Sequence, residues 1–114
     1  MSKFINNEKK LLLQSLCHIK TIELIYEKYN DYNELLKDYM ALDSILLHLE
    51  QIGELSSKFS EEFKLKYSNI DFINIKGLRN IVIHNYEGII YNEIYDVIKK
   101  DIPELNEYYI NILK

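Results

Sequence analysis

Apolar side chains recur at steps of three and four residues in the first part of the chain. The positions are Leu12, Leu16, Ile19, Ile22, Tyr26 and Tyr29. This spacing places them on one face and predicts an amphipathic helix over residues 7–29. The same period then returns through Leu35, Tyr39, Leu42, Leu46, Leu49 and Gly53, with Ile45, Ile52, Leu55 and Phe59 widening the face. Such a chain is expected to bury helix faces against one another.

Polar residues mark where the predicted helices begin and end. The cluster at residues 30–33 ends the first helix and offers caps for the next one. Ser60, followed by two glutamates, is typical of the N-cap of a short helix. A further helix is predicted over residues 71–83, and its inner face is expected to carry Phe72, Ile75, Leu78 and Val82. The last helical region is predicted to begin near Tyr91 and to be interrupted by Pro103, which can open a new helical turn.

Glycine and proline are scarce, with three and one in 114 residues. Sheet-rich folds need many tight turns, so this scarcity favours long helices. We therefore predict an all-α fold, a single domain over residues 1–114 built as an up-and-down bundle of four to five main helices. Gly53 lies on the apolar face, and we interpret it as a point where another helix crosses closely, with a bend as the alternative.

Charge, cysteine content and hydropathy limit which partners and locations the chain is expected to have. The formal net charge is −4, so RNA binding would depend on a local positive patch. Cys17 is the single cysteine and is predicted to pack as a small apolar residue. The first residues lack the apolar run of a signal peptide, and no segment approaches the length of a membrane span. We therefore expect a cytoplasmic protein.

Arg79 is the single arginine beside thirteen lysines, and it stands five residues before His84 and seven before Tyr86. An arginine offers a planar, permanently charged fork that suits phosphate oxygens. A histidine titrates near neutral pH and can move a proton, so the pair suits phosphodiester transfer. On residue types alone, the structural alternative is a surface cation, a polar residue that closes a helix and a packed tyrosine ring.

The sequence does not indicate a metal or a cofactor. The other histidines, His18 and His48, lie in different predicted helices without close acidic or cysteine partners. A phosphate-binding glycine loop does not occur either. We therefore expect neither a metal site nor a cofactor in this chain.

Three blocks of the sequence carry a resemblance to a known family. RNIVIHNY, residues 79–86, has the form arginine, four residues, histidine, one residue, tyrosine. LDSILLHLEQIGELSSKFS, residues 42–60, has Ile-Gly-Glu at its centre, and residues 75–105 end near DIPEL. In order and spacing, these blocks resemble the HepT-like toxins of the HEPN superfamily, over residues 10–110.

The resemblance implies a small helical homodimer that cleaves RNA without a metal, in a cleft shared by two copies. It implies that Arg79 stabilises the scissile phosphate, that His84 is the acid–base group, and that Asn80 positions one of them. Tyr86 matches a tyrosine that, in some systems, a minimal nucleotidyltransferase antitoxin (MntA-like) modifies with AMP. Glu54 is either a partner that orients Arg79 or a solvated helix acid.

Two other functions stay open at this point. One is a catalytically inactive HEPN dimer that serves as a nucleotide- or partner-binding scaffold. The acidic balance favours this scaffold, whereas the intact pair of Arg79 and His84 favours the ribonuclease. The other is a helical dimerisation domain without a site.

Overall fold

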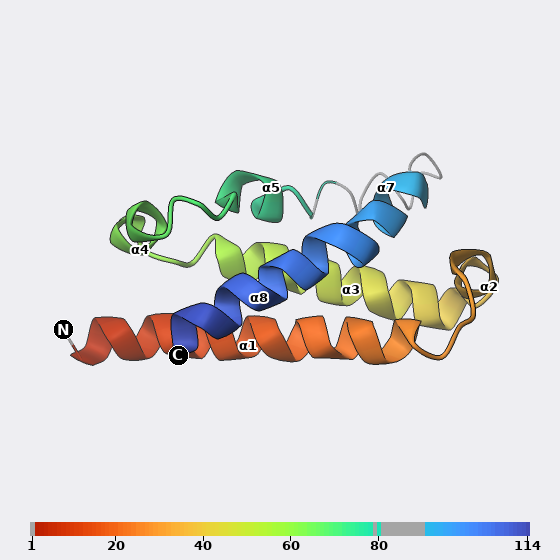
Figure 1. Cartoon of the computed structure of the whole chain (residues 1–114), viewed down its shortest axis with the longest axis horizontal. Helices are drawn as coiled ribbons and strands as arrows, with labels where there is room; N and C mark the ends of the chain where they lie inside the picture. Colours follow the sequence, from red (N-terminus) through yellow and green to blue (C-terminus); the bar gives the residue numbers. More distant parts are fainter. Residues whose placement is uncertain (1, 79, 81–90) are drawn as a thin grey trace.

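Two long antiparallel helices form one side of the molecule. Of the 114 residues, the computed structural model describes 2–78, 80 and 91–114. Helix α1 (Ser2–Tyr26) runs along α3 (Tyr39–Ser56) in the opposite direction, and the short helix α2 (Tyr32–Leu36) lies at the connection between them (Figure 1). This pair provides the largest packing surface in the described part of the chain.

The predicted apolar face of α1 is confirmed by its burial. Leu12, Ile19 and Ile22 are at most 2% exposed, and the remaining predicted positions pack partly against the same core. The helix ends at Tyr26, earlier than predicted. After it the N–H of Tyr29 donates to the carbonyl of Tyr26 at 3.1 Å, a three-residue spacing that tightens the chain into a turn.

Cys17 lies on the exposed side of α1, so the prediction that it packs as an apolar residue is wrong. Residues three and four positions apart share one face of a helix. Cys17 therefore shares its face with Leu13 and Lys20, which are both exposed.

The second apolar pattern is divided between two helices. Asp38 acts as the N-cap of α3, and its Oδ1 accepts the backbone N–H of Ala41 at 3.2 Å. Leu35 lies before this break, in α2, and is fully buried. Tyr39 is 76% exposed although it was expected in the stripe. A new helix begins at Tyr39 after the cap. The apolar face of α2 therefore does not continue onto Tyr39.

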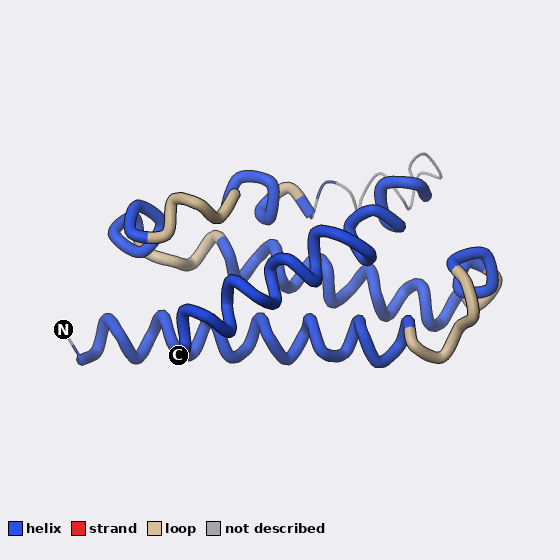
Figure 2. Tube along the Cα trace, viewed as in Figure 1, coloured by secondary structure: helices blue, strands red, loops and turns tan. Residues whose placement is uncertain are grey.

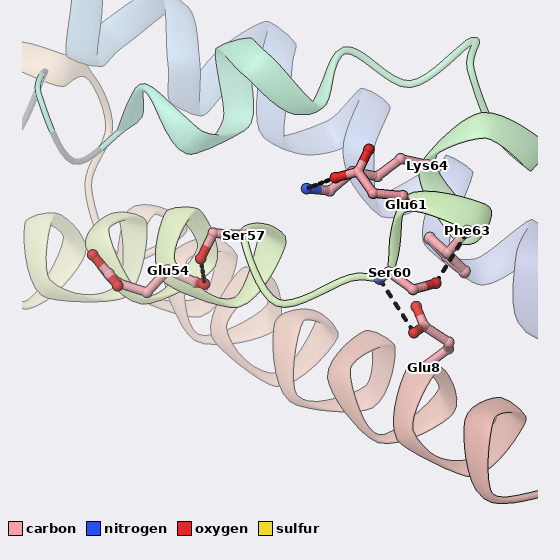
Figure 3. Close-up of polar contacts among 7 residues, drawn as sticks. All are labelled: Glu8, Glu54, Ser57, Ser60, Glu61, Phe63 and Lys64. Carbon is pink, nitrogen blue, oxygen red and sulfur yellow. Dashed lines mark hydrogen bonds and ion pairs between the residues drawn. The ribbon is translucent and has the colours of Figure 1, made fainter.

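Ser60 caps α4 (Glu61–Lys66) as predicted. Its Oγ accepts the N–H of Phe63 at 3.1 Å, and its own N–H donates to Glu8 Oε1 of α1 at 3.4 Å (Figure 3). A carboxylate 52 residues away thus satisfies a second backbone donor of this helix start. The ring of Phe63 stacks on that of Phe59 at 4.4 Å, which fixes α4 to the core.

Helix α5 (Phe72–Lys76) is shorter than the predicted helix over residues 71–83. Asp71 is its N-cap and Gly77 its C-cap, and the N–H of Gly77 donates to the carbonyl of Ile73 at 3.0 Å. The backbone turns at Gly77 and is helical again at Leu78, which is buried as expected. The predicted inner position Val82 lies outside the described residues.

The C-terminal segment is helical from Tyr91 to Leu113. It comprises α7 (Tyr91–Asp96), the π-helix η1 (Val97–Asp101) and α8 (Ile102–Leu113). The chain stays helical through Pro103, so the predicted interruption is a change of hydrogen-bond spacing before the proline and not a break. The prediction that the proline opens a new helical turn is confirmed, because Pro103 lies in the first turn of α8, where a missing N–H costs little.

The core lies between α1, α3 and the C-terminal segment. Ile19, Ile45, Ile94 and Tyr109 are each fully buried there, and α8 packs against α1 (Figure 1). The described residues form helices, turns and loops only (Figure 2). The predicted all-α bundle is confirmed. Its described part has three long helical segments and three short helices. None of the described helices combines the length and apolar character that a membrane span requires.

Candidate functional site

The predicted site residues divide into two groups. Arg79, His84 and Tyr86 lie outside the described residues. Asn80 and Glu54 are described, and the structure brings them to one cavity although they are 26 positions apart in the chain. Asn80 is the neighbour of Arg79 in sequence. This cavity therefore contains the described part of the predicted site.

The cavity has a volume of about 360 Å³ and opens to solvent between the end of α3 and the end of α5. Helix α3 contributes Gly53 and Glu54, and Ser57 follows at its C-cap. The segment around α5 contributes Ile73, Lys76, Gly77 and Asn80. Ser57 is the C-cap of α3 and Gly77 is the C-cap of α5, so both helices end at this cavity.

The end of α3 holds Glu54 and Ser57 in a fixed relation. Ser57 donates its Oγ–H to the backbone carbonyl of Glu54 at 2.7 Å, and its N–H donates to the same oxygen at 3.2 Å (Figure 3). Glu54 itself is half-buried, whereas Ser57 is exposed. The Glu54 backbone is therefore positioned by the helix end, and the Ser57 oxygen keeps its lone pairs as acceptors.

Two glycines line the same cavity. Gly53 is buried in an unbroken stretch of α3, and α3 packs against α5. A Cβ on Gly77 would lie 3.2 Å from the carbonyl oxygen of Asn74, closer than most side chains allow. The absence of side chains at both positions leaves the space between the two helix ends open.

Lys76 is a cavity residue that sequence reasoning missed. It is exposed in the last turn of α5, four positions before Asn80. That spacing corresponds to about one helical turn and was the available signal. Lys76 and Glu54 are the charged residues among the described lining, so their formal charges cancel at neutral pH.

A second cavity, of about 590 Å³, lies between α5 and the C-terminal segment and is acidic. Its charged lining residues are Asp71, Glu93, Asp96, Asp101, Glu104 and Lys100. Burial raises the pKa of Asp101, the charge of Lys100 opposes that rise, and Glu104 and Asp96 add to it. This excess of carboxylates repels phosphate, so the larger cavity does not suit RNA.

The structure pairs the two histidines that the sequence left apart. His18 of α1 and His48 of α3 place their Nδ1 atoms 2.8 Å apart. One nitrogen must donate and the other accept, so at least one ring is neutral. Burial lowers the pKa of both rings, and the charge of His48 lowers that of His18 further. The part of the chain that the structure describes has no group of three or more possible metal ligands.

Comparisons with known proteins agree on one family. The family model for ribonuclease HepT-like proteins matches residues 16–112. A Methanocaldococcus jannaschii protein named as a candidate RNase is 35% identical, over 72% of this chain and 75% of its own length. A Caldanaerobacter subterraneus protein with the same kind of name is 34% identical, over 73% of this chain and 74% of its own.

A third relative carries the HepT name itself. The Thermococcus cleftensis protein named probable ribonuclease HepT is 30% identical, over 75% of this chain and 80% of its own length. No solved structure matches the chain significantly. The match over residues 16–112 includes both α3 and the segment with Arg79 and His84, and the chain belongs to the ribonuclease HepT-like family.

Proposed function

We propose that this chain is a metal-independent endoribonuclease and the toxin of a toxin–antitoxin pair. The observation that carries the proposal is the family match over residues 16–112, a range in which Arg79 and His84 both lie. The cavity supports it, since Asn80 and Glu54 meet there beside the sequence position of Arg79. A fixed cation and a titratable imidazole together supply what phosphodiester cleavage needs.

The cleavage step uses the 2′-hydroxyl of the RNA as nucleophile. His84 accepts the proton of that hydroxyl while its oxygen forms a bond to the adjacent phosphorus. The bond from phosphorus to the 5′-oxygen then breaks, and this oxygen leaves with a proton from an imidazolium or from water. Arg79 donates to the phosphate oxygens, on which negative charge increases in the transition state. The products are a 2′,3′-cyclic phosphate and a 5′-hydroxyl.

Asn80 and Glu54 are proposed as supporting residues. The Asn80 backbone is held by a 3.0 Å hydrogen bond from its N–H to the carbonyl of Gly77, and its exposed side chain lines the cavity. A carboxamide there can donate to a phosphate oxygen or orient the imidazole. The Glu54 carboxylate, at the end of α3, has the charge needed to orient a guanidinium.

We propose that two copies form a homodimer with a shared cleft and that a nucleotidyltransferase antitoxin neutralises it. The antitoxin would transfer AMP from ATP to Tyr86. The phenolic oxygen attacks the α-phosphorus, pyrophosphate leaves, and the phenolic proton passes to a base or to water. The added phosphodiester is anionic and bulky, so it competes with RNA phosphate for Arg79.

A cleavage assay in excess chelator tests the ribonuclease. Wild-type protein is expected to cut RNA, whereas Arg79→Ala and His84→Ala, each with the circular dichroism spectrum of the wild type, are expected to lose cleavage. A folded wild-type protein that leaves RNA intact under every tested condition contradicts the proposal. That outcome favours the inactive scaffold, which the net charge of −4 and the acidic second cavity also support.

Intact mass tests the modification separately. Incubation with the antitoxin and ATP is expected to add the mass of one AMP to wild-type protein and none to Tyr86→Phe. An adduct that persists in Tyr86→Phe would reject this tyrosine as the acceptor. A matched control is Tyr95→Phe, which removes an exposed phenol at a different position and is expected to leave modification unchanged.

A further inference from the structure

The lysines of this chain differ in how far other groups engage them. Lys64 pairs with Glu61 at 3.9 Å, Lys66 lies 5.5 Å from the centre of the Tyr67 ring, and Lys99 lies 5.3 Å from that of Tyr26. Lys76 is exposed and makes no ion pair with any side chain that the structure describes. Its ammonium is therefore available to a ligand in the cavity that it lines.

The surroundings of Lys76 favour an anion with further polar contacts. Asn80 lines the same cavity, and its carboxamide makes no hydrogen bond with another described residue. Ser57 has its hydroxyl proton committed to the Glu54 carbonyl, so its oxygen can accept from a ligand hydroxyl. A cation, an amide donor and a hydroxyl acceptor together match a phosphate linked to a ribose with a 2′-hydroxyl.

We propose that Lys76 binds an RNA phosphate next to the one that is cleaved, in the cavity between the ends of α3 and α5. The proposal rests on the proposed RNA cleavage for the identity of its ligand. Lys76 is a substrate-positioning residue here, because the cleaved phosphate is assigned to Arg79. In a chain with net charge −4, this cation adds a point of attraction for RNA beside the one proposed at Arg79.

The charge balance of the cavity makes Lys76 decisive. Its described lining carries one positive charge, on Lys76, and one negative charge, on Glu54. Substitution of Lys76 with alanine removes the one positive charge of this described lining, so its attraction for phosphate is lost.

RNA binding measured at several salt concentrations tests the subsite. All variants carry His84→Ala so that a short fluorescent single-stranded RNA stays intact, and the buffer contains chelator. Lys76→Ala is expected to raise Kd roughly tenfold at low salt. It is also expected to reduce the slope of log K against log salt by about 0.7, the value for one phosphate contact on a single strand. Lys76→Arg keeps the cation and is expected to bind nearly as the parent does.

Lys37→Ala is the matched control, because Lys37 is exposed at the C-cap of α2, at the other end of the bundle from the cavity (Figure 1). Equal affinities and salt slopes for Lys76→Ala and Lys37→Ala overturn the subsite. A change in sedimentation that accompanies the loss of binding also overturns it, since Lys76 would then act in an interface between copies.

A parallel cleavage assay separates this inference from the proposed function. Wild-type protein that cuts RNA while Lys76→Ala binds as the parent does removes the subsite and keeps the ribonuclease. Lys76-dependent binding without cleavage by the wild type supports the subsite and removes the ribonuclease. Protein that binds no RNA at all overturns both.

Discussion

At position 79, we propose that the shape of the cation matters as well as its charge. Arginine donates two parallel hydrogen bonds to phosphate oxygens, whereas lysine is a compact point charge. Every other fixed side-chain cation of the chain is a lysine, which favours a use of the guanidinium fork at this position. Lys76, by contrast, is proposed to need only its charge.

We expect Arg79→Lys to cut RNA roughly tenfold to hundredfold more slowly than wild type, because the charge stays and one oriented donor is lost. The single-turnover rate at saturating RNA measures this effect. Lys37→Arg, the reverse exchange at a distant exposed position, is the control. A rate equal to wild type for Arg79→Lys would show that position 79 needs only a positive charge.

The Tyr109 hydroxyl is a buried polar group in the core. The residue is fully buried, its ring lies 6.0 Å from that of Phe59, and its hydroxyl has no hydrogen-bond partner among the residues that the structure describes. We expect Tyr109→Phe to raise the free energy of unfolding by about 1 to 2 kcal/mol, since the uncompensated desolvation of the hydroxyl is removed. Urea denaturation measures it.

Tyr108→Phe is the control for this prediction, because Tyr108 is only half-buried and its hydroxyl is not among the unpartnered buried atoms. Its effect on stability is expected to be small. Destabilisation by Tyr109→Phe would instead show that the hydroxyl is hydrogen-bonded in solution and would contradict the prediction.

At the scale of single elements, α4 depends on its first turn. It has six residues, and isolated helices of that length are unstable in water. Ser60→Ala removes the oxygen that accepts the Phe63 N–H and is expected to cost about 1 kcal/mol. The shift in urea midpoint checks this. Ser68→Ala, an exposed serine in the following turn, is expected to have little effect, and equal effects of the two would show that the cap does not stabilise α4.

Much of the element order could be predicted from the sequence. The periodicity of apolar residues identified α1, α3 and the C-terminal segment, and Ser60 was recognisable as a cap from its type and neighbours. The break at Asp38 was not predicted from the sequence. Leu35 of α2 has the same apolar spacing as the residues of α3, so the two helices looked like one until the structure showed Asp38 as the N-cap of α3. Pro103 was expected to interrupt the last helix. The sequence did not reveal the preceding π-helix, in which the backbone hydrogen-bond spacing changes while the chain stays helical.

The site was predictable only in part. Arg79 and His84 were proposed from residue chemistry and the family resemblance and stay a prediction, whereas the cavity that joins Glu54 to Asn80 depends on how α3 meets α5. Lys76 enters that cavity through the same packing. The contact between His18 and His48 likewise arises from the register of α1 against α3, which neither helix encodes alone.

At the scale of the whole molecule, this histidine pair links packing to pH. Because burial lowers both pKa values below their usual 6.5, the unfolded chain binds these protons more readily than the folded one. The pair's contribution to stability is therefore full above pH 6.5 and is lost as pH falls below that value, until the folded pKa values are passed.

We expect wild-type protein to lose more stability between about pH 7.5 and about pH 5.5 than a variant with His18→Gln and His48→Gln, since imidazoles titrate in this window. Urea midpoints at the two pH values give the comparison. His84 is present in both proteins, so its titration cancels in the difference. The same loss of stability in both proteins would exclude the pair as the cause.

Charge is distributed unevenly over the molecule. The larger cavity gathers carboxylates, whereas the cavity at Asn80 is balanced by Lys76. An acidic protein that contacts RNA phosphates through few cations is expected to bind weakly as a single copy, and two copies in a dimer would double the number of such contacts. This arrangement accords with the proposed shared cleft.

The central claim is that Arg79 and His84 cut RNA through its own 2′-hydroxyl. It is tested most directly by the single-turnover rate on a defined RNA in excess chelator, beside the same strand made as DNA. We predict that wild-type protein cuts the RNA to 2′,3′-cyclic phosphate ends and leaves the DNA intact, and that His84→Ala is at least about a hundredfold slower. Equal rates for wild type and His84→Ala, or cleavage of the DNA strand, would contradict the account.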